Sequence, residues 1–247
     1  PRCVSGMLAS LDAYSRYIRP EDARRMKAQN EGEFAGIGVK IDLDSERGRI
    51  FVLTPLLDSP AFKAGIQPGD RIVQINEQST EGMDVEQTES LFAGKQGEPI
   101  RLVIEREGAD EPITLDVPRG VVHVESVVGS QRSPDFTWDH WLDRDARIGY
   151  VRISTFSNDT ADQLRKTLRM LQDEGIKGLV LDLRFNPGGV LRSAIDVADV
   201  FLDQGNIVTI KFRTGDPEVH DASRLFTVSD LPLVVLINRM SASGSEI

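Results

Sequence analysis

The sequence predicts two folded parts: a mostly antiparallel β domain with two helices, followed by an α/β domain with a parallel sheet. Between residues 34 and 118, short strands alternate with turn residues. From residue 148 onward, continuous apolar strands alternate with helical stretches, which is typical of a buried parallel sheet. The chain has 247 residues, 40% of them hydrophobic and 28% charged, which is enough for two domains with real cores.

Residues 1–33 are expected to form a short helical segment rather than a domain. Apolar residues at helical spacing predict short helices at 7–11, 14–18 and 20–26. Pro20 suits the first position of a helix, because its missing N–H is not needed there.

Residues 34–118 are predicted to form a partial antiparallel barrel with two helices. Helices are expected at 59–64 and 85–93. The expected strands are 38–43, 49–53, 71–75, 100–105 and 113–117.

Residues 119–247 are predicted to be an α/β domain that begins with a polar connection to about residue 145, including a linker-like stretch at 129–134. Helices are expected at 159–174, with Leu164, Leu168 and Leu171 on one face and Gly175 ending it, and at 190–202. The expected strands of the buried sheet are 148–153, 178–183, 207–212 and 233–237.

Composition excludes several classes of function. The 29 basic and 39 acidic residues give a net charge of -10, and no basic stripe could neutralise nucleic-acid phosphates. The single cysteine, Cys3, allows no internal disulfide. No run has the length of a transmembrane helix. We expect no metal or cofactor, and we expect the chain to be part of a longer protein because it starts at Pro1.

A glycine-flanked apolar residue precedes the first expected strand of the β domain, in the sequence FAGIGV at 34–39. Gly36 and Gly38 let successive backbone N–H groups turn toward one point, while Ile37 and Val39 supply apolar side chains. An anionic chain terminus could bind there. The alternative is that these glycines only form a tight turn.

Further motifs follow at matching spacing: SPA at 59–61, AGI at 64–66, PGDRI at 68–72 and IN at 75–76. With them, residues 34–118 resemble a PDZ domain. The resemblance implies that a peptide adds as a strand beside residues 39–41, with its terminal carboxylate on the Gly36–Gly38 backbone. The opposite wall would be Val85, Thr88, Glu89 and Phe92, unless that helix face is core. The implied partners are proteins with apolar C-terminal tails.

Two strand ends in the α/β domain carry the elements of an acyl-transfer site. DLRFNPGG at 182–189 leads from a strand into a helix, where glycine N–H groups can face a substrate oxygen. NRMSASGSEI at 238–247 follows the next apolar strand. Because parallel strands deliver their carboxyl ends to one sheet edge, we expect both loops to meet. Taken alone, each loop could be a packing turn or a helix cap.

The combination resembles the carboxy-terminal processing, or tail-specific, serine proteases of peptidase family S41, which carry Arg-x-Asn-x-Gly-Gly and Ser-Ala-Ser-x-Ser-Glu segments. GML at 6–8, SLD at 10–12, Tyr14 and Ser15 also match that family. The resemblance implies that Ser243 is the nucleophile and that backbone N–H groups of Gly188, Gly189 and Gly244 bind the oxyanion. It implies that Ser241 and Ser245 have local structural roles, with Ser245 as the N-cap of the helix that should follow. Gly244 stands where the family usually has alanine.

No base for Ser243 is evident in the sequence. His123, His140 and His220 lie in no strand-end motif, and we expect them at surfaces or in packing. The resemblance instead implies a Ser-Lys dyad whose lysine lies beyond residue 247, so the chain alone should be inactive. Peptide capture by strand addition suggests that the PDZ domain moves relative to the core and acts as a gate. The family resemblance also implies a location in the periplasm or otherwise outside the cytoplasm.

Two other functions stay open at this point. One is a catalytically inactive homologue that binds peptides through its PDZ domain, which the absence of the lysine would favour. The other is a crotonase-like enzyme, because the core also resembles that fold, in which paired backbone donors stabilise an enolate. Thioester turnover without peptide cleavage would favour the latter.

Overall fold

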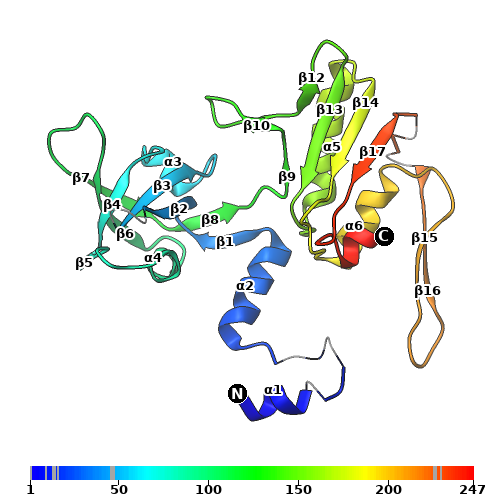
Figure 1. The fold of residues 1–247 in the computed structure, drawn as a ribbon, viewed down its shortest axis with the longest axis horizontal. Coiled ribbons are helices and arrows are strands. Elements are labelled where there is room, and N and C mark those ends of the chain that lie inside the picture. Colours follow the sequence, from blue (N-terminus) through cyan, green and yellow to red (C-terminus); the bar gives the residue numbers. More distant parts are fainter. Residues whose placement is uncertain are drawn as a thin grey trace.

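The computed structural model describes residues 2–8, 10–12, 15, 17–44, 48–224, 227–228 and 230–247. Figure 1 shows two β-rich bodies, one built from β2–β7 and the other around β13, β14 and β17, with two helices near the N-terminus. No helix in the described part of the chain is long and apolar enough to cross a membrane.

The N-terminal segment holds two helices, α1 (Arg2–Leu8) and α2 (Pro20–Glu31). Helix α2 starts at Pro20 as predicted, but it continues past residue 26 to Glu31. It ends at Gly32, which forms the C-cap with a left-handed φ of 72°. Glycine adopts this conformation without a steric penalty. A helix was predicted at 7–11, but the observed helix α1 begins at Arg2 and ends at Leu8. The one predicted at 14–18 includes Tyr14 and Arg16, which lie outside the described residues.

A two-stranded ribbon that the sequence did not predict joins the two bodies. Strands β1 (Glu33–Gly36) and β8 (Gly120–His123) pair antiparallel, with Gly36 opposite Gly120. The chain therefore enters and leaves the first body side by side (Figure 1).

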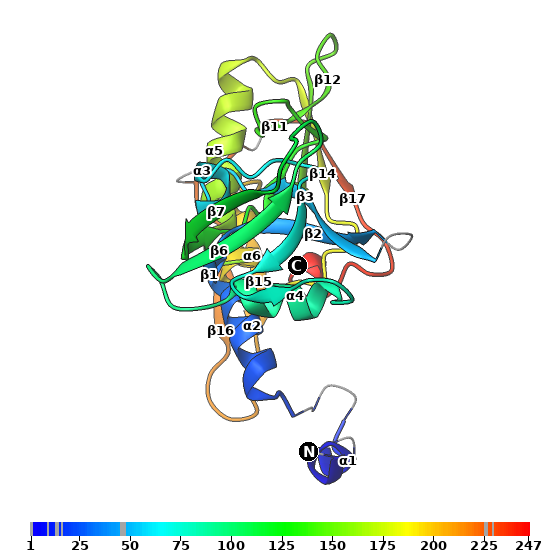
Figure 2. The same cartoon turned by 90° about the vertical axis from the view of Figure 1, so that its left-hand side faces the viewer.

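The first body is an antiparallel sheet with strand order β2-β3-β4-β6-β7, with β5 paired to β4. Its elements agree closely with the predicted ones, and in the described residues its outer strands β2 and β7 do not pair with each other. The bounds are β2 (Val39–Asp44), β3 (Arg49–Pro55), α3 (Pro60–Lys63), β4 (Arg71–Ile75), β5 (Gln78–Ser79), α4 (Val85–Phe92), β6 (Pro99–Glu105) and β7 (Ile113–Pro118). Figure 2 shows this sheet face-on, with α4 along its lower edge.

Local chemistry explains both helices of this body. The Ser59 hydroxyl accepts the Phe62 N–H at the start of α3. Asp84 and Gln87 form a reciprocal capping box at the start of α4. The buried side chain of Asp70 receives two hydrogen bonds from Arg106, at 2.7 and 2.8 Å, which compensate its burial.

The predicted polar connection contains short strands: β9 (Val127–Val128), β10 (Gln131–Arg132), β11 (Trp138–Asp139) and β12 (Trp141–Asp143). The β10–β11 hairpin places the Phe136 ring edge-on to the Phe62 ring of α3, with centroids 5.6 Å apart. This contact links the hairpin to the first body.

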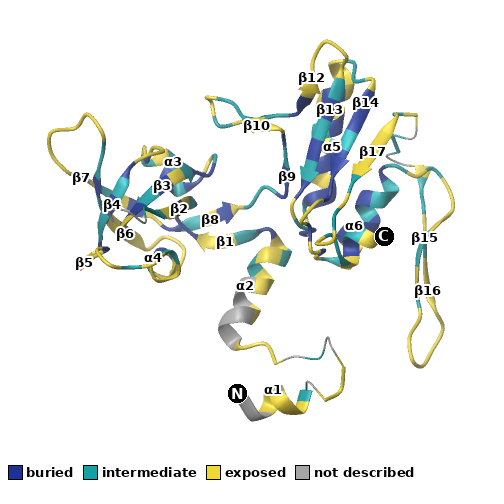
Figure 3. Ribbon diagram, viewed as in Figure 1, coloured by how far each residue is buried: buried dark blue, intermediate teal, exposed yellow. Residues whose placement is uncertain are grey.

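The second body is an α/β unit with strand order β12-β13-β14-β17. Strands β13 (Ile148–Ile153), β14 (Gly178–Asp182) and β17 (Leu233–Leu236) are parallel, as predicted. Helix α5 (Thr160–Asp173) buries Leu164, Leu168 and Leu171 on one face, and α6 (Leu191–Asp199) follows β14. Within this body, Figure 3 shows buried residues in β13, β14, α5 and α6.

One predicted strand does not join this sheet. Strand β15 (Asn206–Ile210) pairs antiparallel with β16 (Glu218–Asp221) in a projecting hairpin (Figure 1). The turn-rich sequence around Gly215, which has φ 101°, offers β15 a partner that is close in sequence. The parallel sheet is therefore narrower than the apolar pattern indicated.

Candidate active site

The loops that follow β14 and β17 meet at one edge of the sheet, as the sequence predicted. Three hydrogen bonds connect them: Ser241 Oγ to Leu183 O at 2.8 Å, Ala242 N to Asn186 O at 3.1 Å, and Ser245 Oγ to Asn186 O at 3.1 Å. The serine segment is thereby held against the glycine-rich loop. Ser241 and Ser245 thus hold the two loops together through their hydroxyl groups, and the N-cap role expected for Ser245 stays a prediction.

Asn186 organises the glycine-rich loop. Its side chain is fully buried, donates Nδ2 to Ile153 O at 3.0 Å, and accepts the Gly188 N–H at 2.8 Å. A Cβ on Gly188 would lie 2.7 Å from Ser243 Cβ, and one on Gly189 would lie 2.1 Å from Phe156 O. Both positions therefore require glycine, and their φ values of 100° and 148° reinforce this.

Ser243 begins a 3-10 turn, Ser243–Glu246, and is exposed. Its φ of 54° is unusual for a residue other than glycine. Its own N–H donates to Glu246 Oε2 at 2.7 Å, whereas its hydroxyl hydrogen bonds to no other described residue. The serine side chain is therefore available to a substrate.

The backbone donors beside Ser243 differ from the predicted set in one respect. The Gly188 N–H is occupied by Asn186 Oδ1, because the amide side chain folds back over its own loop. The N–H groups of Gly189 and Gly244 donate to no other residue that the structure describes. Two of the three expected donors are thus unoccupied in this conformation.

A buried carboxylate, that of Asp182, accepts hydrogen bonds from the start of the glycine-rich loop. Asp182, the last residue of β14, is fully buried and accepts Arg184 Nε at 2.9 Å, Arg184 Nη2 at 2.7 Å and Tyr150 Oη at 2.6 Å. It also accepts the Arg184 backbone N–H at 2.9 Å. Burial acts to raise the pKa of Asp182, but the hydrogen bonds from Arg184 and Tyr150 outweigh burial and lower this pKa to about 2.

The three histidines lie outside this arrangement. His123 and His220 face Glu33 and Glu218, and His140 lies near Tyr150 O. Burial lowers the pKa of His140. In the described part of the chain, neither a histidine nor a lysine hydrogen bonds to Ser243.

The predicted peptide site lies along β2 of the first body. Val39 begins β2, an outer strand whose pairing partner among the described residues is β3 alone. Before it, Gly38 has φ 74°, and its carbonyl accepts Leu56 N and Ser59 Oγ, both at 2.9 Å. The N–H groups of Ile37 and Gly38 donate to no other described residue, so two adjacent donors are open there. Gly36 is paired in the β1–β8 ribbon, and the Ile37 side chain is buried.

The predicted opposite wall is only partly exposed. Helix α4 contacts β2, with Glu89 exposed and Val85 half-buried. Thr88 and Phe92, in contrast, are 0% and 6% exposed, and Phe92 belongs to the apolar core. Because α4 packs directly on the core, these two residues line no open groove in this conformation.

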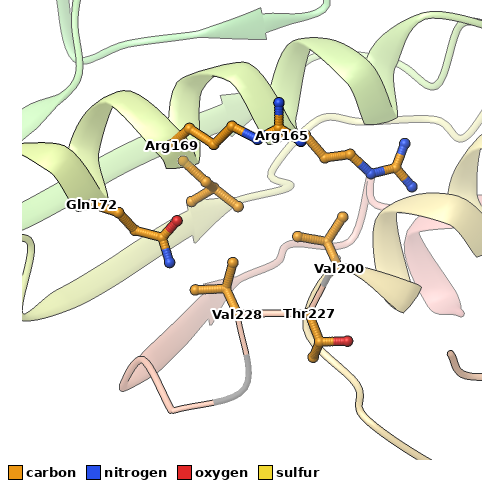
Figure 4. A pocket seen from close by; sticks show the side chains of 7 residues that line it. Arg165, Arg169, Gln172, Val200, Thr227 and Val228 are labelled. Carbon is orange, nitrogen blue, oxygen red and sulfur yellow. The ribbon is translucent and has the colours of Figure 1, made fainter. Parts of the chain in front are cut away.

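A cavity of about 190 Å³ lies elsewhere in the α/β body (Figure 4). None of its lining residues belongs to either loop of the candidate site. They are Arg165, Leu168, Arg169, Gln172, Val200, Thr227 and Val228. Among the residues that the structure describes, no group of three or more His, Cys, Asp or Glu could hold a metal ion.

Two family models match the chain: peptidase family S41 over residues 147–247, and a PDZ domain over residues 51–106. Carboxy-terminal processing protease CtpA of Bacillus subtilis (strain 168) is 35% identical over 246 residues, which cover 99% of this chain and 49% of that protein. The carboxy-terminal-processing protease of Bartonella bacilliformis is also 35% identical, over 99% of this chain and 54% of its own length.

A solved structure titled photosystem II D1 C-terminal processing protease is 29% identical and covers 98% of this chain and 64% of its own, with a TM-score of 0.44. The chain spans about half the length of the two curated relatives.

Proposed function

The chain belongs to peptidase family S41 and carries a PDZ domain, and on that premise we propose that the protein is a carboxy-terminal processing serine endopeptidase. It would bind the C-terminal tail of a protein substrate at the PDZ domain and cleave the substrate at Ser243. The observation that carries this proposal is the exposed Ser243 hydroxyl beside two unoccupied backbone donors.

In the proposed reaction, Ser243 Oγ attacks the carbonyl carbon of the scissile peptide bond and loses its proton to a base. The negative charge on the carbonyl oxygen would be stabilised by the N–H groups of Gly189 and Gly244, which donate to no other described residue. The C–N bond then breaks as the leaving amine takes up the proton, and water hydrolyses the acyl-enzyme. We propose that the base is a lysine beyond residue 247, as the resemblance to family S41 implies, and in the described residues neither a histidine nor a lysine hydrogen bonds to Ser243.

For tail binding, we propose that an extended peptide pairs with the free edge of β2 and that its carboxylate binds the Ile37 and Gly38 N–H groups. The unpaired edge and the two open donors support this placement. Because Thr88 and Phe92 are buried, α4 would have to shift for apolar tail residues to reach them. Selectivity for apolar tails depends on that movement.

The test compares the full-length protein with its Ser243→Ala variant on an unstructured peptide that ends in an apolar tail. We expect the wild-type protein to release fragments detectable by mass spectrometry, and Ser243→Ala to lose at least about 10³-fold of this activity. Ser245→Ala is the neighbouring control and should keep measurable cleavage. Full activity in Ser243→Ala would refute the assignment of the nucleophile.

A second arm uses the same peptide with an amidated C-terminus. If the carboxylate is recognised at Ile37 and Gly38, amidation should weaken binding to Ser243→Ala, measured by fluorescence anisotropy. Tail binding by a wild-type protein that cleaves nothing would favour a peptide-binding homologue without protease activity.

A further inference from the structure

Phe185, in the glycine-rich loop, combines two features that are unfavourable together. Its φ of 64° lies in the left-handed region, which is strained for a bulky side chain. Its side chain is also 62% exposed, so burial within the chain does little to offset the strain. Asparagine or glycine would occupy this position more easily.

Phe136 shows what a packed counterpart looks like. It has nearly the same φ, 65°, but its ring is half-buried and packs edge-on against Phe62 at 5.6 Å. Contact within the chain therefore accounts for the phenyl group at position 136. No comparable ring contact is present for Phe185 in the described residues.

The backbone of Phe185 is held rigidly on both sides. The Arg184 N–H donates to Asp182, and Asn186 is fully buried. The Phe185 N–H itself donates to Asn238 Oδ1 at 3.0 Å. The exposed ring is thus presented from a fixed loop, which is what a binding subsite requires.

Asn238 also ties a second exposed apolar residue to Phe185. The Met240 N–H donates to the same oxygen, Asn238 Oδ1, at 3.0 Å. The backbone N–H groups of Phe185 and Met240 therefore meet at one oxygen, in the loops that carry Gly188 and Ser243, and the Met240 side chain is 55% exposed. An exposed ring and an exposed, flexible thioether on two such connected loops offer an adaptable apolar surface.

We propose that Phe185 and Met240 form an apolar subsite for the substrate side chain next to the scissile bond, and that Phe185 determines specificity there. This inference rests on the proposed protease activity. A large apolar side chain on the substrate would bury the exposed ring, which gives the strained phenylalanine the contact that it lacks within the chain. A small or polar side chain would gain little from this surface.

The test uses the full-length protein and a pair of peptides with identical C-terminal tails. Cleavage sites of the wild-type protein are first mapped by mass spectrometry, and the two peptides then carry Leu or Ala beside the mapped bond. Phe185→Asn should lower kcat/KM for the Leu peptide at least about tenfold and change that for the Ala peptide less than about threefold. Its Tm should stay equal or rise, because asparagine tolerates the left-handed backbone.

Two further variants make the outcome specific. Phe185→Leu should keep most of the preference for the Leu peptide, since it stays apolar. Phe212→Asn replaces another exposed phenylalanine, which is 54% exposed and lies just beyond β15, and should leave the preference unchanged.

An unchanged Leu/Ala ratio in Phe185→Asn, or an equal loss on both peptides, would overturn the subsite while leaving the protease assignment intact. A wild-type protein that cleaves neither peptide nor unfolded protein would overturn the proposed function and the subsite with it.

Discussion

Replacing Asp182 by asparagine is predicted to make the α/β body less stable in a way that depends on pH. Asp182 is fully buried and accepts hydrogen bonds from Arg184 and Tyr150. Asparagine has nearly the same shape but no charge, so it cannot replace the ion pair or accept the same set of donors. The variant therefore tests how much the charged network contributes to the fold.

The magnitude follows from the pKa. Asp182 titrates at about 2 in the folded protein against an ordinary value of 3.8. At about 1.36 kcal/mol per pKa unit, the ionised carboxylate stabilises the fold by about 2 kcal/mol at neutral pH. Because Arg184 is half exposed, solvent screening makes this an upper value for the ion pair.

The sign follows from the direction of the shift. Since the pKa is lower in the folded state, the stabilisation is complete above the unfolded pKa and is lost as pH falls through the folded value. About half of it should be gone at pH 3. The wild-type protein should thus exceed Asp182→Asn by about 2 kcal/mol in free energy of unfolding at pH 7 and by about 1 kcal/mol at pH 3.

Urea denaturation followed by tryptophan fluorescence measures this difference, because the buried Trp141 belongs to the core of the α/β body. Asp173→Asn removes an exposed carboxylate at the end of α5 and should change stability by less than about 0.5 kcal/mol. A wild-type advantage over Asp182→Asn that is constant between pH 7 and pH 3 would refute the reasoning.

Two further variants test packing at the site and in the core. Gly188→Ala places a Cβ 2.7 Å from Ser243 Cβ and should reduce peptide cleavage at least about 10²-fold with unchanged circular dichroism. Gly205→Ala is its control, with φ 101° but open space around the new Cβ, and retained cleavage in Gly188→Ala would contradict the prediction. Leu168→Ala empties a position that is 1% exposed on α5 and should cost about 2–5 kcal/mol in chemical denaturation; a loss no larger than that of the exposed Met170→Ala would contradict it.

The elements with strong local patterns could be predicted from the sequence. Strands β4 and β13 have the predicted bounds, and α5 begins and ends within one residue of its prediction. Regular apolar spacing and capping residues define these elements locally. The β1–β8 ribbon could not be predicted, because its partners are far apart in the sequence: Gly36 pairs with Gly120, 84 positions later, and Glu33 with His123, 90 positions later. Such pairing depends on how the whole body closes rather than on either segment alone.

The candidate site likewise has parts that could be predicted from the sequence and parts that could not. The serine and glycine loops were predicted, because their residue types and their places after parallel strands are properties of the sequence. The use of the Gly188 N–H by Asn186 Oδ1 was not, since a side-chain amide can turn toward many partners. The burial of Thr88 and Phe92 likewise depends on how closely α4 approaches the core. Side-chain contacts of this kind depend on the folded structure and could not be predicted from the spacing of residue types in the sequence.

The strained geometry of the site and its proposed chemistry have a common structural origin. Phe185 and Ser243 have positive φ values of 64° and 54°, so the two loops store backbone strain where a substrate would react. Little apolar burial offsets this strain, because Phe185 and Ser243 are exposed. The offset comes from the side-chain hydrogen bonds of Asp182 and Asn186 to loop N–H groups. Protonation of Asp182 should therefore loosen the loop that presents Phe185 before it unfolds the core.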